Sequence, residues 1–410
     1  NFFTPARNYL NHLKLRLSWG QLGNQAGIGL YDHYQYINIG GTYPFGNSNN
    51  PLKVPNASLG AMPAVDRTWE TIETYNAGID FATLNNRLSG TFDYFIKDNK
   101  NMFYAEEFPT ILGTSAPSIN GAHVRTNGWE LTLNWKDKIG KVGYRIGLNL
   151  SDNKTKVISL SDSRNPGHGL MGFVEGYPTN SFFIYEFDGF IKDEADLADY
   201  KTKMKGGVPT NLRVGDAKYV DKDGDGVLEP TLYKEGDPNS GDIVYKGTNN
   251  QRYLYGINLG LDWKGIDISA FLQGVGKWDC INGTYAGGGE VWKQSSQYFY
   301  HNTWSPDRPN AEYPRLTQDG GIHGYNYQWS DAPYKFFNNR YLRLKEVQIG
   351  YTFPTTLTKK IGVEKLRVYA TGMNLLEWDN LPNGFDPEAP YTENLIPFSR
   401  TYSIGVNVQF

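Results

Sequence analysis

The sequence predicts an all-β protein made of long antiparallel strands, of the kind that closes into a transmembrane β-barrel. Three observations predict it. Apolar and polar residues alternate over many segments; aromatic residues make up 15% of the chain, with 29 tyrosines; and connections between segments alternate between short and long. Period-two alternation places every second side chain on one face of a strand. Tyrosine and tryptophan concentrate where one end of the ring is wet and the other is not.

Composition narrows the class of protein. A net charge of −3 and a pI of about 6.1 over 410 residues give no electrostatic case for a nucleic-acid partner. The single cysteine, Cys280, excludes an internal disulfide framework. No run approaches the roughly 18 apolar residues of a membrane helix, but a β-barrel needs none, because only alternate residues face lipid. The chain begins with Asn and shows no signal peptide, which indicates a mature or fragmentary chain.

The alternating segments are long. Several keep the pattern for roughly nine or more residues, enough to cross a bilayer at a tilt, whereas globular strands are usually nearer five or six. Aromatic residues stand at both ends of some segments, as in an aromatic girdle. The segments are HLKLRLSWG (12–20), ETYNAGIDF (73–81), RLSGTFDYFIKD (87–98), NGWELTLNW (127–135), YRIGLNL (144–150), YLYGINLGLDW (253–263), DISAFLQG (267–274), LRVYATG (366–372) and RTYSIGVNVQF (400–410).

The lengths of the connections distinguish the two ends of the predicted sheet. Short turns are predicted at 84–87, 136–143 and 264–267. Long loops are predicted at about 40–71, 160–177, 192–250 and 274–338. Short turns on one side and long loops on the other are typical of outer-membrane barrels, and loops this long are uncommon in compact soluble domains. The one predicted helix, Asp193–Gly206, lies inside a long loop, with acids in its first turn and lysines late.

The chain ends on a strand with no polar tail. Its alternate apolar residues are Tyr402, Ile404, Val406, Val408 and Phe410. A terminal strand with nothing after it can close the seam of a barrel by edge pairing, so we interpret these residues as a barrel-assembly signal. The alternative is the last strand of a soluble sandwich that happens to end in Phe.

The sharpest local motif is YVDKDGDGVLEP (219–230). Asp221, Asp223 and Asp225 sit at i, i+2 and i+4 before Gly226, the start of an EF-hand-like loop for Ca²⁺ or Mg²⁺. A backbone carbonyl from Val227 and the side chain of Glu229 would complete the set. Leu232 stands where a bidentate Glu is expected, and no flanking helix pair is evident, so we expect weaker affinity than in a calcium sensor. The alternative is an acidic, glycine-rich turn without metal.

Catalytic constellations are missing from the sequence, which contains no zinc helix, nucleophile elbow or P-loop, so we expect a protein that is not an enzyme. Aromatic side chains in the long loops could stack on sugar rings or peptide side chains of a ligand; packing of a loop onto itself or a partner is the alternative. These candidates are Trp292, Tyr298, Tyr300, Trp304 and Trp329.

Several stretches, taken in order, resemble the C-terminal part of SusC/RagA-type TonB-dependent transporters of Bacteroidetes. The resemblance covers the chain from about Leu13 to Phe410 and is most specific in the order SWGQLGNQ, YFIKDN, NGWE and RYLRLKEVQIGYTFP. It also includes LKLRLSWGQLGNQ, WETIETYNAGIDF, RLSGTFDYFIKDNKNMFY, LRVYATGMNLLEW and YSIGVNVQF.

The resemblance implies a barrel of about 22 strands around a plug, in the bacterial outer membrane. It implies import of glycan or oligopeptide nutrients, driven by TonB, beneath a SusD-like surface lipoprotein that acts as a lid, with membrane lipid and lipopolysaccharide (LPS) around the barrel. About a dozen strand candidates and no plug are present, so we expect a C-terminal portion, cleaved or split, that closes with the N-terminal barrel and plug part. Open sheet edges are not viable in lipid.

Two other classes stay open. One is a soluble all-β carbohydrate-binding or structural protein, which solubility without detergent would favour. The other is an outer-membrane β-barrel enzyme, which hydrolysis of a glycan or ester would favour.

Overall fold

The long strands form one antiparallel sheet. The computed structural model describes residues 10–46, 52–60, 62–63, 66–105, 111, 117–161, 166–281, 301–381, 386–388 and 398–410. Ten strands pair in the order β1-β4-β5-β6-β7-β13-β14-β17-β18-β19, so each strand lies beside the next long strand along the chain. Their bounds are β1 Leu10–Asn24, β4 Glu70–Thr83, β5 Leu88–Ala105, β6 Ser118–Ile139, β7 Val142–Leu160, β13 Arg252–Trp263, β14 Ile266–Lys277, β17 Tyr341–Thr352, β18 Lys365–Asp379 and β19 Thr401–Gln409.

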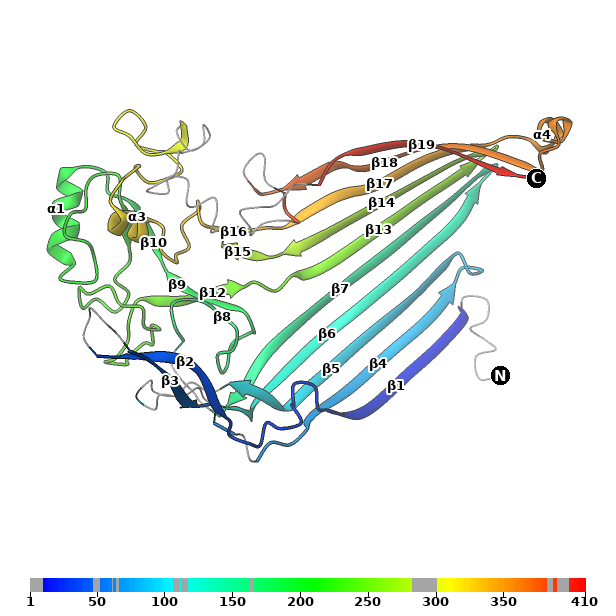
Figure 1. Ribbon diagram of the computed structural model, residues 1–410. Coiled ribbons are helices and arrows are strands. Elements are labelled where there is room, and N and C mark those ends of the chain that lie inside the picture. The colour runs from blue at the N-terminus through cyan, green and yellow to red at the C-terminus, as the bar shows by residue number, and fades with distance from the viewer. Residues whose placement is uncertain are drawn as a thin grey trace.

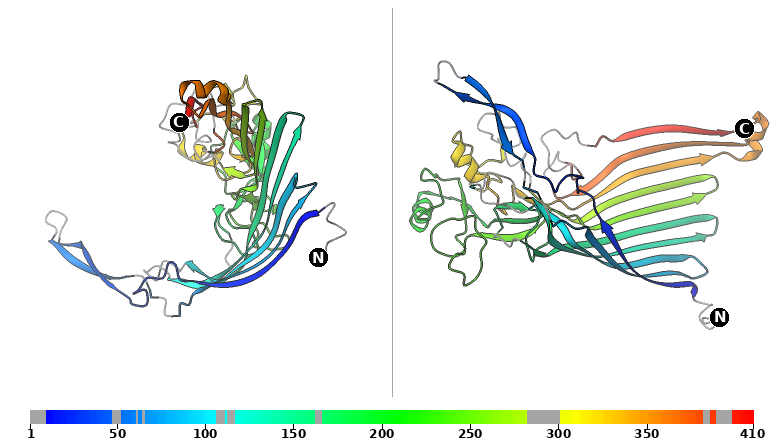
Figure 2. Two further views of the ribbon diagram at one scale, coloured as in Figure 1. Left: turned by 90° about the vertical axis from the view of Figure 1, so that its right-hand side faces the viewer. Right: turned by 60° about the horizontal axis from the view of Figure 1, so that its bottom comes forward.

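The sheet is curved and open. Figures 1 and 2 show it as a bent wall, with the start of β1 and the C-terminus at the end that carries the short turns and the loop elements at the other end. Strands β1 and β19 form its two edges, and within the described part of the chain each has one neighbour in this sheet. No helix among the described residues is long and apolar enough to span a membrane. The predicted antiparallel architecture is confirmed, and the described residues contribute ten strands to this sheet.

The register gives the sheet an apolar and a polar face. Neighbouring strands align row by row, and one row on the apolar face consists of Leu15, Ile79, Phe92, Leu131 and Leu150. The adjoining row, one residue along, consists of Arg16, Gly78, Asp93, Glu130 and Ser151, whose side chains lie on the opposite face. Ile79 and Phe92 of this row are each 39% exposed, although strands lie on both sides of them, and a water-soluble sheet would bury such residues.

Two arginines lie flat along the polar face near the two edges of the sheet. Arg16 on β1 crosses β4 at Gly78 and bonds Asp93 on β5, with Nη1 and Nη2 at 2.9 and 2.8 Å from the carboxylate oxygens. Arg367 on β18 likewise crosses β17 at Gly350 and bonds Asp267 on β14, its Nε lying 3.0 Å from Oδ1. Each arginine therefore ties together strands that are not neighbours, over a glycine that leaves room for the guanidinium.

We expect Gly350→Ala to destabilise the barrel by about 1–3 kcal/mol. A Cβ at this position would lie 2.5 Å from Nη2 of Arg367, so the guanidinium would have to leave Asp267. Urea unfolding of the whole barrel in lipid vesicles measures the loss. The matched control is Gly20→Ala on β1, where an added Cβ meets nothing within 4 Å. Equal stability of the two variants would contradict the role of Gly350.

The remaining elements lie in the connections. Hairpin β2–β3 stands away from the wall (Figure 2), and α4 and η3 form the β17–β18 connection at the end that carries the termini. The bounds are β2 Ile37–Phe45, β3 Leu52–Leu59, β8 Gly169–Met171, β9 Ser181–Tyr185, β10 Phe187–Phe190, α1 Glu194–Lys203, β11 Ala217–Tyr219, β12 Ile243–Thr248, β15 Asp279–Ile281, α3 Gly320–Asn326, β16 Phe336–Asn338, α4 Thr355–Thr358 and η3 Lys359–Ile361.

Residues 166–250 and 301–338 fold into a unit that we call the cap, at the long-loop end of the sheet (Figure 1). Its core is apolar and aromatic, and its buried members include Phe183, Tyr185, Ile191, Leu197, Tyr200, Leu212, Tyr219, Leu228, Leu232, Ile243, Ile322 and Tyr325. The predicted helix is confirmed as α1, which Asp193 caps by accepting a hydrogen bond from the backbone of Asp196. It ends at Lys203, before the predicted stop at Gly206, and helices α3 and α4 were not predicted.

Candidate functional site

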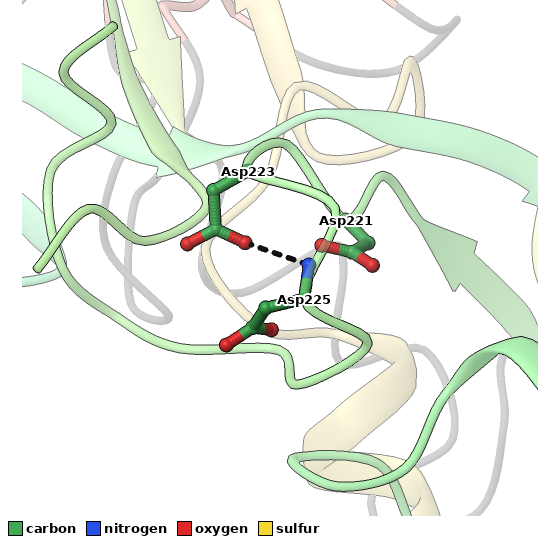
Figure 3. Close-up of side chains that lie close together, drawn as sticks. All are labelled: Asp221, Asp223 and Asp225. Atoms are coloured by element: carbon green, nitrogen blue, oxygen red, sulfur yellow. Dashed lines mark hydrogen bonds between the residues drawn. The ribbon is translucent and has the colours of Figure 1, made fainter. Parts of the chain in front are cut away.

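The acidic loop lies in the cap, between α1 and β12. The carboxylate oxygens of Asp221, Asp223 and Asp225 lie within 4.8 Å of one another, and they are the one cluster of at least three metal-ligating side chains among the described residues. Figure 3 shows the three side chains around the turn, with the backbone N–H of Asp225 donating to Asp223. Asp221 accepts from the backbone of Gly224 and Gly226, both at 2.8 Å. The sequence therefore folds locally so that three carboxylates converge.

The other two predicted ligands, Val227 and Glu229, come after the turn that carries the three aspartates. Val227 follows the turn, where its N–H donates to Asp225 at 2.6 Å. The carboxylate of Glu229 is outside the three-aspartate cluster, and its N–H donates to Asp242 at 2.8 Å. Leu232, at the expected place of a bidentate Glu, is a buried member of the cap core. The twelfth residue of the loop is thus an apolar anchor, so a ligand in place of the expected bidentate Glu would come from solvent or from another segment.

Asp242 adds a fourth negative group to this region, and the sequence did not single it out. It is fully buried and accepts hydrogen bonds from the backbone of Lys222 and Glu229. Burial raises its pKa above the usual range, and the nearby charges of Asp223 and Asp221 raise the pKa further. A divalent cation held by the aspartates would relieve this repulsion between carboxylates.

A second buried carboxylate holds the two chain segments of the cap together. Asp216 is fully buried; Arg315 lies 2.8 Å away, and the side-chain amide of Asn326 donates to it at 2.9 Å. The partners lie about 100 residues further along the chain, so the sequence carries no local signal for this contact. The acidic loop therefore follows a segment that these contacts of Asp216 hold in place.

The predicted ligand-stacking aromatics are in part described. Trp304 packs against Gly215, and Trp329 packs against Gly169 and lies 6.5 Å from Phe182 between ring centroids. Both are half-buried within the cap, so packing accounts for their contacts, and their stacking on a ligand stays a prediction. Trp292, Tyr298 and Tyr300 lie outside the described residues.

A buried lysine accompanies Trp329. The ammonium of Lys335 lies 5.8 Å from the centroid of the Trp329 ring, and the residue is 8% exposed. Burial lowers the pKa of Lys335 to about 8. The indole face partly compensates the buried charge.

A recess lies on the polar face of the sheet. It has a volume of about 640 Å³ and spans strands from the β4–β5 turn to β17. Its polar lining includes Arg87, Asn134, Arg145, Asn149, Asn258 and Glu346. A polar surface of this kind suits contact with water, with a polar solute or with a protein body, and does not suit contact with lipid.

The predicted barrel-assembly residues share one face of β19. Tyr402, Ile404, Val406 and Val408 continue the apolar rows of β18, with Ile404 opposite Ala370 and Val406 opposite Val368. Tyr402, Ile404 and Phe410 are between 74% and 86% exposed. They stand at the open edge of the sheet, where a closing strand would pair.

Comparison with known proteins agrees with this architecture. The chain is 27% identical over 83% of its length to TonB-dependent receptor P3 of Formosa agariphila, and 26% identical over 98% to TonB-dependent receptor SusC of Bacteroides thetaiotaomicron. It spans about a third to two fifths of these curated relatives, 34% and 38% of their lengths. No protein-family model matches the chain.

Solved structures show the same fold. The whole chain superposes on 42% of a chain in the structure of the RagAB peptide transporter, with a TM-score of 0.72 and 23% identity. A RagAB peptide importer in an open state gives a TM-score of 0.73 over 41% of its chain. The two-faced sheet and its cap therefore have the fold of part of a β-barrel of this kind. The chain is therefore similar in sequence, over 83–98% of its length, to part of proteins named as TonB-dependent receptors, and similar in fold to part of the RagAB chain.

Proposed function

We propose that this chain forms the C-terminal part of the barrel of a TonB-dependent importer of glycan or oligopeptide nutrients. One observation carries the proposal: a single sheet has an apolar face and a polar face, the polar face has a recess of about 640 Å³, and a folded cap stands at the long-loop end. Such a wall separates hydrocarbon from a polar path. The relatives carry the name of TonB-dependent receptors, which supports energised uptake.

The partners follow from the geometry and the relatives. The free edges at β1 and β19 need other strands in a bilayer, which the N-terminal barrel and plug part would supply. A SusD-like lipoprotein would cover the cap, and TonB would engage the plug part. The proposed mechanism is binding and gated passage of the nutrient, without covalent chemistry.

Growth of a deletion strain tests the proposal. Cells lacking the whole protein should lose growth on one glycan or oligopeptide as sole nutrient, and the intact gene should restore it. Removal of TonB should abolish the restored growth in the same medium. Normal growth of the deletion strain on every nutrient that the wild type uses, or uptake unaffected by TonB, would contradict import by this route.

The two alternative classes have separate tests. Solubility of the chain without detergent would favour a carbohydrate-binding or structural protein. Hydrolysis of glycan or ester by the purified protein would favour an outer-membrane enzyme. The open apolar face argues against the first, since Ile146 on β7 is 44% exposed and Leu259 on β13 is 41% exposed, although strands lie on both sides of each.

We also propose that Asp221, Asp223 and Asp225 hold a Ca²⁺ or Mg²⁺ ion that stiffens the cap. Three converging carboxylates beside buried Asp242 support this, as does the oxygen chemistry of these hard cations. At a calcium concentration about 100 times the dissociation constant, binding should stabilise the cap by roughly 2.7 kcal/mol.

Calorimetry of the whole protein measures this effect. Calcium should raise the melting temperature of the wild type and leave Asp223→Ala unchanged. Asp237→Ala, an acid-to-alanine change elsewhere in the cap, is the matched control and should respond to calcium as the wild type does. A wild type without a calcium response, or a response that survives in Asp223→Ala, would contradict the site.

A further inference from the structure

The apolar face ends abruptly near the long-loop end of the sheet. One row across β1, β4, β5, β6 and β7 is Leu17, Ala77, Tyr94, Trp129 and Asp152. The next row on that face is Trp19, Tyr75, Ile96, Asn127 and Lys154. The row after that is Gln21, Glu73, Asp98, Arg125 and Lys156. The surface of this face therefore changes from apolar to charged side chains within about two rows, or roughly 13 Å along a strand.

Two amphipathic rings mark the boundary. The indole N–H of Trp19 donates to Glu73 at 3.0 Å, and the hydroxyl of Tyr75 donates to the same carboxylate at 2.7 Å. Their ring bodies lie on the apolar side, and their polar ends point to the charged row. Tryptophan and tyrosine take this arrangement at the level of lipid headgroups.

Above the boundary, cations outnumber anions. Arg125 bonds buried Asp98 through Nε and Nη2, and Lys100 lies 2.6 Å from Glu73. Lys154 and Lys156 are both exposed, and neither has a salt bridge to a described residue. The carboxylates are therefore already matched, whereas the two lysines on β7 have no acidic partner in the part of the chain that the structure describes, on a face that meets the membrane.

A groove lies directly beside this charged region. It has a volume of about 410 Å³ and is lined mainly by Leu17, Trp19, Tyr75, Ala77, Tyr94 and Ile96. These residues belong to β1, β4 and β5, and Lys100 lies on β5 as well. The groove lies beside a band of basic residues, Lys100, Arg125, Lys154 and Lys156, which we call the basic band. This combination matches a molecule that has a hydrocarbon chain and an anionic head.

We propose that these residues bind a phosphorylated lipid of the outer leaflet. Its phosphate groups lie against Lys100, Arg125, Lys154 and Lys156, and one acyl chain lies in the groove. The cations occupy three adjacent strands, a span of about 10 Å, which suits a headgroup with more than one phosphate. Charge complementarity selects the anionic lipid over a zwitterionic one. This proposal rests on the membrane placement of the chain and does not depend on transport.

Native mass spectrometry of the purified whole protein tests the site. The probes are bis-phosphorylated lipid A and its dephosphorylated form, each added in the same detergent. The Lys154→Gln/Lys156→Gln variant should retain the phosphorylated probe roughly 30-fold less well than the wild type, at about fivefold for each lysine. Retention of the dephosphorylated probe should not change. Lys359→Gln/Lys360→Gln, the same charge change at the opposite end of the sheet, should retain both probes as the wild type does.

A second variant separates the groove from the charge. Tyr75→Ala should weaken retention of both probes, because the groove contacts the acyl chain. Heat-dependent gel mobility confirms that each variant is folded. Equal retention of both probes by the wild type, or wild-type retention of phosphorylated lipid by the Lys154→Gln/Lys156→Gln variant, would overturn the proposal. Nutrient uptake can stay intact in either case, so failure here is distinct from failure of the import proposal.

Discussion

Leu259→Arg is expected to lower the free energy of unfolding of the barrel by about 2–4 kcal/mol, the cost of a charge near the bilayer midplane on a lipid-facing strand. Leu259 lies in the middle row of β13, between Ile146 on β7 and Ala270 on β14. It is 41% exposed, although strands lie on both sides of it. Urea unfolding of the whole barrel in lipid vesicles measures the difference.

The neighbouring residue supplies the matched control. Asn258 lies next to Leu259 on the same strand, but its side chain lies on the opposite, polar face of the sheet. Asn258→Arg should therefore change the stability by less than about 0.5 kcal/mol. If both variants unfold alike, or if the Asn258 variant is the weaker, the assignment of the apolar face to lipid is wrong.

Much of the sheet could be predicted from the sequence because its signal is local. In segments such as 253–263, the alternation of apolar and polar residues shows which face of the strand each side chain occupies. Turns such as 264–267 carry glycine where the backbone needs a positive φ (Gly265, φ +88). The strands of the cap are shorter, at three to six residues, and have no alternation to read. Long-range packing around residues such as Tyr219 decides where they form, and that packing is absent from any short window.

The candidate sites divide in the same way. Asp221, Asp223 and Asp225 converge because a tight turn brings close residues together, so their spacing was sufficient to find them. Asp242 and Asp216 are buried beside partners from distant segments, and nothing in their immediate sequence indicates it. The basic band above Trp19 was missed for a related reason: its cations belong to three strands, and only the register shows that they are adjacent.

Replacing the five apolar residues of the last strand with serine is expected to abolish assembly of the barrel. Tyr402, Ile404, Val406 and Val408 present one apolar face on β19, which pairs with β18, and Phe410 directly follows the strand. Each substitution removes about 1–2 kcal/mol of the favourable free energy of transferring the side chain from water to hydrocarbon. The five losses together reach or exceed the roughly 5 kcal/mol of net folding stability that many proteins have. An edge strand without an apolar face cannot place a closing seam in lipid. Heat-dependent gel mobility of outer-membrane fractions measures the folded protein.

The control keeps the apolar face and changes the other one. Ser403→Thr/Asn407→Thr/Gln409→Thr alters the polar positions that alternate with the five, and it should leave the amount of folded barrel in the membrane unchanged. Because both variants change the same strand, a difference between them isolates the face and not the strand itself. Membrane insertion of the serine variant at the wild-type level would show that the seam is specified elsewhere in the chain, and the assembly role of the terminal residues would be wrong.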